Sequence, residues 1–213
     1  MNVMVDGNGK FTLILAHGAG AGMDSAFLQS FSTALAKLGV RVVRFEFPYM
    51  ELIRLTGKRR PPNKMQQLLN RFIDVIEAEG DCEHLFIGGK SLGGRVATVL
   101  LTDIEAAVQL KARNIHGCIC LGYPFHPPGK PEKLRTEHLF KLAHPLHIVQ
   151  GEKDPFGSLQ DIQGYQLPKG ISIDYVEGGN HDLKSARKYG VAHGEQISRA
   201  AHSVYMFMKS VAL

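Results

Sequence analysis

The five residues from Gly89 to Gly93, Gly-Lys-Ser-Leu-Gly, constrain the fold of this chain more than any other segment. A short apolar run, Leu85 to Ile87, precedes them, and apolar residues at helical spacing follow from Val96 to Leu101. The pattern predicts a strand, a sharp turn and a helix, with Ser91 at the apex of the turn. Glycine at both flanks suits so tight a turn because it carries no Cβ. Ser91 is therefore predicted to project its hydroxyl beside a helix N-terminus, which favours negative charge.

Two further polar residues follow predicted strands later in the chain. Asp154 comes after the apolar run Leu146 to Val149, and His181 comes after the β-rich run Ile171 to Val176. In open sheets of parallel strands, side chains that leave the carboxyl ends of the strands meet at one edge of the sheet. A serine, an acid and a histidine in this chain order are typical of a site for nucleophilic catalysis. We therefore take Ser91, Asp154 and His181 as the candidate catalytic residues.

A glycine-rich segment, His17 to Gly22, follows another apolar run that reads as a buried strand. Its small residues would allow the backbone to approach Ser91 and to present N–H groups there. The amide of Ala19, or of an immediate neighbour, and the amide of Leu92 are the expected donors of an oxyanion hole. Loss of one such donor typically costs about 3 kcal/mol of transition-state stabilisation. His17 is expected to brace this segment.

Taken together, these segments resemble the small α/β-hydrolases. More narrowly, the chain is similar to the subgroup related to the testis-expressed protein 30 and to the hydrolase-like region of the KAT8 regulatory NSL complex subunit. The resemblance covers nearly the whole chain and is carried by residues 15–20, 89–95, 122–130, 150–157 and 181–183. It implies an α/β-hydrolase fold and a triad of Ser91, Asp154 and His181, and it implies no particular substrate.

Strand and helix patterns alternate along the chain, which favours a mostly parallel sheet with helices on both faces. We count about six strands and expect residues 1–213 to form a single α/β-hydrolase domain, a length that supports a substantial core. The connection between Cys120 and His144 is the only plausible place for a cap over the site, and it is short. Within it, Pro131 to Leu142 is expected to be a short helix. We therefore expect minimal or no cap and a shallow site.

The chain carries 25 Lys and Arg residues against 20 Asp and Glu residues, a formal net charge of +5. It contains no arginine-rich arm and no recognised nucleic-acid module, so we expect no nucleic-acid partner. Basic residues concentrate in one proline-containing loop, Lys58 to Lys64. A solvated loop is the plainer interpretation. In the alternative, Arg59 and Arg60 overhang the site and bind an anionic part of the substrate.

Location and cofactors are constrained by what the sequence lacks. No apolar run is long enough to span a bilayer, and the N-terminus does not have a basic segment followed by an apolar stretch. We therefore expect a cytoplasmic protein with no membrane partner. No cysteines or histidines are grouped as metal ligands, so neither a metal nor an organic cofactor is expected. The oligomeric state is left open.

Two phosphate-binding motifs fit the sequence less well. The glycine pattern that starts at Gly18 would need glycine or alanine at Met23 to make a dinucleotide-binding turn. Gly89-Lys90-Ser91 imitates the end of a P-loop, but His84 stands where that motif requires glycine. Neither motif explains the later aspartate and histidine.

The expected reaction is hydrolysis of a carboxylic ester or thioester with a small acyl group. His181 would take the proton of Ser91, an acyl-enzyme would form, and Asp154 would hold the imidazole in the required tautomer. Asp161 and Asp182 are weaker candidates for the acid. The alternative is a hydrolase fold that serves as a binding or scaffold module without turnover. The intact set of three residues favours the enzyme, because a scaffold has no physical need for it.

Overall fold

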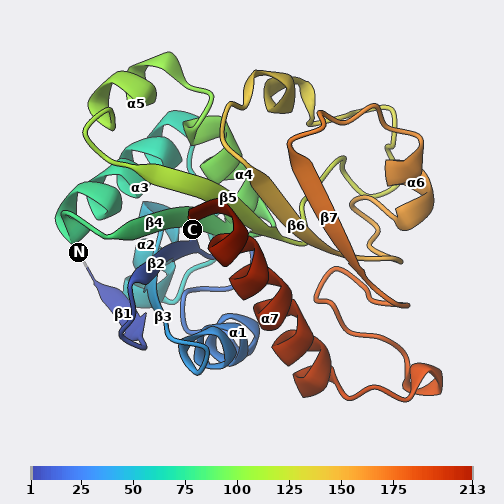
Figure 1. Ribbon diagram of the computed structural model, residues 1–213. Coiled ribbons are helices and arrows are strands. Elements are labelled where there is room, and N and C mark those ends of the chain that lie inside the picture. The colour runs from blue at the N-terminus through green and yellow to red at the C-terminus, as the bar shows by residue number, and fades with distance from the viewer. Residues whose placement is uncertain (1, 213) are drawn as a thin grey trace.

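The computed structural model describes residues 2–212, and its centre is one sheet in the order β1-β3-β2-β4-β5-β6-β7 (Figure 1). Strands β2 to β7 run parallel to their neighbours, whereas β1 pairs antiparallel with β3. The strands are β1 Val3–Asp6, β2 Phe11–Ala16, β3 Val40–Phe45, β4 His84–Lys90, β5 Ile115–Leu121, β6 Leu146–Gly151 and β7 Ile171–Val176. The mostly parallel sheet is confirmed, but it has seven strands rather than about six. The additional strand, β1, is short and half exposed, so it has no buried-strand pattern in the sequence.

Helices connect the strands and cover both faces of the sheet (Figure 1). The buried residues of α1 and α7 share one apolar cluster on one face, and those of α2, α3 and α4 share another. The helices are α1 Ala26–Ala36, α2 Pro48–Thr56, α3 Met65–Glu79, α4 Leu92–Leu100, α5 Ile104–Gln109, α6 Leu159–Gln163 and α7 His193–Ala212. Two 3₁₀ helices, η1 Glu137–Lys141 and η2 Arg187–Tyr189, lie in connections. No helix in this described range is both long enough and apolar enough to cross a membrane.

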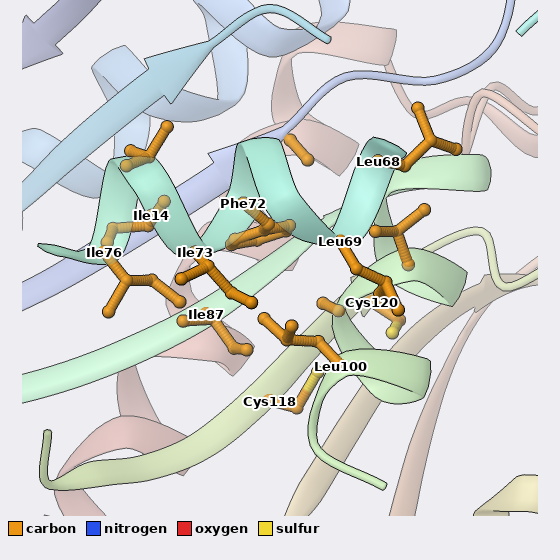
Figure 2. Close-up of a cluster of buried hydrophobic side chains, with 14 of the residues drawn as sticks. Ile14, Leu68, Leu69, Phe72, Ile73, Ile76, Ile87, Leu100, Cys118 and Cys120 are labelled. Carbon is orange, nitrogen blue, oxygen red and sulfur yellow. The ribbon is translucent and has the colours of Figure 1, made fainter. Parts of the chain in front are cut away.

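Strand β2 illustrates how the two clusters form. Successive side chains of a strand point to opposite faces, so Leu13 and Leu15 join the cluster under α1 and α7 while Ile14 joins the cluster under α3. Figure 2 shows Ile14 of β2 and Ile87 of β4 beneath α3. Full burial of one such side chain stabilises the fold by about 1.5–3 kcal/mol. The sheet is therefore fixed on both faces, and the loops at its carboxyl edge rest on a rigid support.

Two connections differ from the sequence expectation. The run from Val40 to Phe47 in the sequence predicts one strand, but β3 ends at Phe45 and α2 begins at Pro48, since proline is well suited to the first position of a helix. The connection between β5 and β6 contains only the 3₁₀ helix η1 at Glu137–Lys141 in place of a helix over Pro131 to Leu142. No helical cap therefore covers the carboxyl edge from this connection.

Candidate active site

Ser91 lies at the sharp turn between β4 and α4 that the sequence predicts. Its φ is 51° and its ψ is −112°, a conformation that L-residues other than glycine rarely adopt. A Cβ on Gly93 would lie 2.6 Å from the carbonyl oxygen of Ala16, and a Cβ on Gly89 would overlap the Gly93 backbone. Both glycines are therefore required by close backbone packing, which brings α4 directly against β4 and β2.

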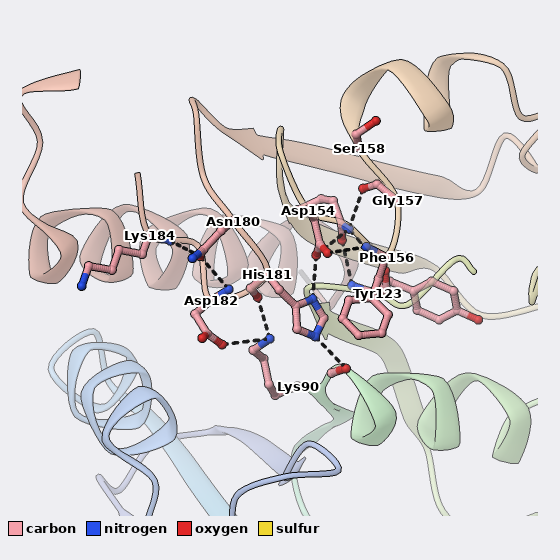
Figure 3. A network of polar contacts seen from close by, with 12 residues as sticks. Lys90, Tyr123, Asp154, Phe156, Gly157, Ser158, Asn180, His181, Asp182 and Lys184 are labelled. Atoms are coloured by element: carbon pink, nitrogen blue, oxygen red, sulfur yellow. Dashed lines mark hydrogen bonds and ion pairs between the residues drawn. The ribbon is translucent and has the colours of Figure 1, made fainter. Parts of the chain in front are cut away.

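The structure brings the three candidate residues together at the carboxyl edge of the sheet, although they come from three different loops. Figure 3 shows two of them, Asp154 and His181, facing each other. Ser91 follows β4, Asp154 follows β6 and His181 follows β7. His181 Nδ1 is 2.7 Å from Asp154 Oδ2, and His181 Nε2 is 2.8 Å from Ser91 Oγ. Because the carboxylate can only accept, Nδ1 carries the proton and Nε2 accepts from the serine hydroxyl. This orientation suits removal of the serine proton.

Asp154 is completely buried, and every contact of its carboxylate favours one orientation. Oδ1 accepts from the Phe156 amide at 2.8 Å, and Oδ2 accepts from Gln150 Nε2 at 3.0 Å as well as from His181. The same Gln150 amide group donates to the carbonyl of Gly157 at 3.0 Å. Sequence reasoning missed Gln150. The only sign of it in the sequence is a glutamine directly after the apolar run Leu146 to Val149, in the strand that leads to Asp154.

His181 is held by its ring and by its main chain. The ring of Phe156 lies over the imidazole, with the ring centroids 4.3 Å apart. The ammonium group of Lys90 donates to the carbonyl oxygen of His181 at 2.6 Å and is 3.5 Å from a carboxylate oxygen of Asp182 (Figure 3). The two weaker candidates for the acid thus have other partners, since Asp182 faces Lys90 and Asp161 accepts from the Ser158 hydroxyl at 2.6 Å.

The glycine-rich segment after β2 is braced from beneath by two side chains. The Phe47 amide donates to Nε2 of His17 at 3.1 Å, so Nδ1 of His17 donates to the carbonyl of Gly18 at 2.6 Å. Burial lowers the pKa of His17, which keeps this ring neutral. The Tyr49 hydroxyl lies 3.0 Å from the carbonyl of Ala19 and 3.3 Å from that of Gly18. Sequence reasoning expected the contribution of His17 and missed Tyr49.

The expected oxyanion donors belong to two segments near Ser91: Leu92 follows it in the chain, and Ala19 lines the same cavity. Leu92 is the first residue of α4, so its amide has no intrahelical acceptor. Within residues 2–212, neither this amide nor that of Ala19 donates a hydrogen bond to the protein. An N–H group without a protein acceptor is what an oxyanion hole requires.

A cavity of about 380 Å³ opens at Ser91. It is lined by parts of the segment 18–28, together with Lys90, Phe156, His181 and Asp182. A larger hollow of about 860 Å³ lies between α7 and strands β6 and β7, and it contains none of the three candidate residues. No group of three or more potential metal ligands occurs in the described part of the chain.

Arg59 and Arg60 belong to the basic loop for which substrate binding is the alternative to a solvated loop. Both are exposed in the connection between α2 and α3, and neither lines the cavity at Ser91. These two arginines are absent from the cavity wall because of the side on which the cavity opens. It faces the start of α1, with Phe27 and Leu28 in its wall, whereas α2 and α3 cover the opposite face of the sheet.

A parallel sheet with a serine at a strained turn after its central strand is the architecture of an α/β-hydrolase. The chain matches the alpha/beta hydrolase domain family over residues 9–209 and belongs to that family.

Several solved structures share the fold. Est1E from Butyrivibrio proteoclasticus, with ferulic acid bound, is 16% identical, with 98% of this chain and 95% of that chain covered and a TM-score of 0.68. Dienelactone hydrolase from Anabaena variabilis is 14% identical, with 96% and 89% covered and a TM-score of 0.68. A serine hydrolase without lid from Xanthomonas campestris is 18% identical, with 93% and 88% covered and a TM-score of 0.58.

Proposed function

We propose that this protein is a serine hydrolase that cleaves small carboxylic esters or thioesters through an acyl-enzyme. One observation carries the proposal: the unbroken chain of contacts from Asp154 through His181 to Ser91, at 2.7 and 2.8 Å. Hydrogen bonds of this length at both ring nitrogens are what a nucleophile, a base and an orienting acid require.

The reaction follows from these contacts. His181 Nε2 takes the proton of Ser91 as Oγ attacks the acyl carbon, and the carbonyl oxygen becomes negative. The amides of Ala19 and Leu92 stabilise that oxygen, and Asp154 offsets the charge of the imidazolium. The imidazolium then gives its proton to the leaving alcohol or thiol, which departs as the acyl-enzyme forms. Water attacks the acyl-enzyme with His181 again as base, which releases the acid and restores Ser91.

The cavity supports a small acyl substrate. Its volume of about 380 Å³ is near the lower end for small-molecule sites, and its wall includes the apolar side chains of Phe27, Leu28 and Phe156. The family relatives support an ester, because Est1E binds ferulic acid and another relative is a dienelactone hydrolase. The proposed substrate is therefore an ester or thioester of a short, uncharged acyl group.

Labelling with a serine-reactive fluorophosphonate probe tests the proposal directly. The wild-type protein should be labelled, whereas Ser91→Ala and His181→Ala should not be. Ser198→Ala is the matched control, because Ser198 is an exposed serine on α7 and should leave labelling unchanged. A folded wild-type protein that reacts with neither the probe nor short p-nitrophenyl esters would contradict the proposal. It would favour a binding or scaffold module instead.

From the sequence resemblance we also propose that the chain lies in the subgroup related to the testis-expressed protein 30 and the KAT8 regulatory NSL complex subunit. We propose in addition that residues 1–213 form one domain. The segment 122–130, together with the three site segments, supports this narrower assignment. Limited proteolysis tests the single domain, since an interdomain linker would be cut before the rest of the chain.

A further inference from the structure

Lys90 stands directly before the nucleophile, yet only 8% of its side chain is exposed to solvent. Lysine is rarely buried to this degree unless its ammonium group is paired with a polar or charged partner. We propose that Lys90 is a positioning residue that fixes the main chain of His181 and, through it, the imidazole that faces Ser91. This inference rests on the proposed function and adds a residue to the same site.

Three contacts surround the ammonium group. Its shortest is the hydrogen bond to the carbonyl oxygen of His181 at 2.6 Å. A carboxylate oxygen of Asp182 lies 3.5 Å away, and the centroid of the Phe27 ring lies 5.3 Å away. A hydrogen bond from a charged donor is stronger than one between neutral groups, and more so where water is excluded. Lys90 therefore holds the loop after β7 against the turn after β4.

Gly122 gives a second, independent sign that this contact is built into the fold. Its φ is +65°, and a Cβ there would lie 2.9 Å from the carbonyl oxygen of His181, 3.2 Å from Lys90 Nζ and 3.3 Å from His181 Nδ1. The loop after β5 thus comes as close to the ammonium–carbonyl pair as glycine permits. Lys90, His181 and Gly122 are therefore packed closely, with no room for a side chain on residue 122.

The consequence for catalysis is geometric. His181 is attached to two consecutive residues of the turn, by its carbonyl to Lys90 and by Nε2 to Ser91. Two attachment points stop the imidazole from pivoting away from the nucleophile, and small displacements of a base from its productive position greatly reduce the rate. Asp182 and Asp154 are the carboxylates whose negative charge offsets that of Lys90. Burial lowers the pKa of Lys90, and these two carboxylates oppose that effect.

The test compares Lys90→Met, which keeps the length of the side chain and removes the donor, with Lys90→Arg, which keeps a donor. Hydrolysis of an uncharged p-nitrophenyl ester is measured. We expect kcat to fall about tenfold to hundredfold in Lys90→Met with KM within about twofold of wild type, because a base held less firmly slows the chemical step. Lys90→Arg should recover several-fold of the lost kcat. Lys184→Met, an exposed lysine in the same loop, is the matched control and should leave kcat unchanged.

A spectroscopic readout separates positioning from a general effect on stability. The proton on Nδ1 of His181, shared with Asp154, should give a low-field ¹H resonance in wild type that is broadened or shifted in Lys90→Met. In wild type, the Nζ protons of Lys90 should exchange slowly with water, with the signal assigned through Lys90→Arg. This last measurement does not depend on the folding of the methionine variant.

The outcomes distinguish the inference from the function on which it rests. A kcat of Lys90→Met equal to wild type, or rapid exchange of the Lys90 Nζ protons, overturns the positioning contribution while leaving the hydrolase proposal intact. A rise in KM alone that appears only with anionic esters also overturns it, because Lys90 would then bind substrate. Failure of wild-type protein to react with fluorophosphonate, by contrast, rejects the proposed function itself.

Discussion

Gln150 is completely buried at the end of β6, and its side-chain amide contacts two loops, the one after β6 and the one after β5. Nε2 donates to Asp154 and to the carbonyl of Gly157, while Oε1 accepts from the amide of Tyr123 at 2.7 Å. At the scale of single residues, it is the group that links the acid of the proposed triad to the loop after β5.

Replacing Gln150 with alanine should therefore affect stability and rate together. The Tyr123 amide would lose its acceptor in a buried place, which typically costs about 1–3 kcal/mol of unfolding free energy. Asp154 would lose one of its donors, and we expect kcat for a short ester to fall about tenfold, as is typical when support for a site is removed. Urea denaturation and steady-state kinetics measure the two effects. Gln163→Ala, at an exposed glutamine of α6, should change neither, and equal behaviour of the two variants would refute this account.

The positions of Ser91, Asp154 and His181 could be expected from sequence because each follows a recognisable strand and parallel strands end at one edge. Gln150 and Lys90 could not be expected in the same way. Their contacts join segments that are far apart in the chain, as in the 91 residues that separate Lys90 from His181. No periodic pattern records such a contact, so only the folded structure reveals it.

At the scale of elements, the turn between β4 and α4 depends on close backbone packing. Gly93→Ala should lower the unfolding free energy by about 1–3 kcal/mol or more, because the new Cβ would meet the Ala16 carbonyl oxygen at 2.6 Å and force β2 and α4 apart. Thermal unfolding measures the change, and the rate of fluorophosphonate labelling should fall with it.

A second glycine provides the control for this substitution. Gly194 lies in α7, and a Cβ there would have no atom within 4 Å. Gly194→Ala should be neutral or stabilise the protein by about 0.5–1 kcal/mol, as expected for alanine in a helix. If Gly93→Ala were as well tolerated as Gly194→Ala, the turn would be looser than the structure indicates.

Helix α2 contacts the glycine-rich segment of the site through the hydroxyl group of Tyr49. Tyr49→Phe removes the donor to the carbonyls of Gly18 and Ala19 but keeps the ring in the core. A hydrogen bond contributes about 1 kcal/mol to the unfolding free energy, so we expect a loss of stability of about that size, and the same energy lost in the transition state would lower kcat/KM about fivefold. Tyr175→Phe is the control, since the Tyr175 hydroxyl has no hydrogen bond within the described residues. Unchanged kcat/KM in Tyr49→Phe would mean that the Ala19 amide is oriented without it.

The elements that sequence reasoning missed share a physical cause. Strand β1 and helices α5 and α6 are short, with four to six residues each, and so cannot complete a clear hydrophobic period. Helix α2 is longer, but only Tyr49 and Met50 are buried, so its apolar face is brief. By contrast, the strands that lead to the site, β2, β4, β6 and β7, had clear apolar or β-rich runs and were predicted from the sequence.

At the scale of the whole molecule, buried and half-buried histidines make stability depend on pH. Burial lowers the pKa of His17, His144 and His147, and burial together with the charge of Arg95 lowers that of His138 to about 4. The unfolded chain binds protons at these residues below pH about 6.5 while the folded chain does not. The stability that is present above this pH should therefore be lost as pH falls toward 4.

Urea denaturation between pH 7 and pH 4 measures this loss as a slope of unfolding free energy against pH. This slope measures how many more protons the unfolded chain binds than the folded chain. His138→Gln should lower that difference by up to about one proton, because glutamine does not titrate and can still contact Thr98. His202→Gln, at an exposed histidine of α7, should leave the slope unchanged. The same slope in both variants would show that His138 is not the source of the acid sensitivity.

The separation of the three site residues along the chain has a consequence for biosynthesis. The turn that carries Ser91 can form once β2, β4 and β5 are in place, whereas the imidazole arrives only with the loop after β7, the last strand of the sheet. During synthesis on the ribosome, 90 further residues must be added after Ser91 before His181 is present to contact it. Reactivity would thus be the last property that this polypeptide gains, after nearly all of its sheet has assembled.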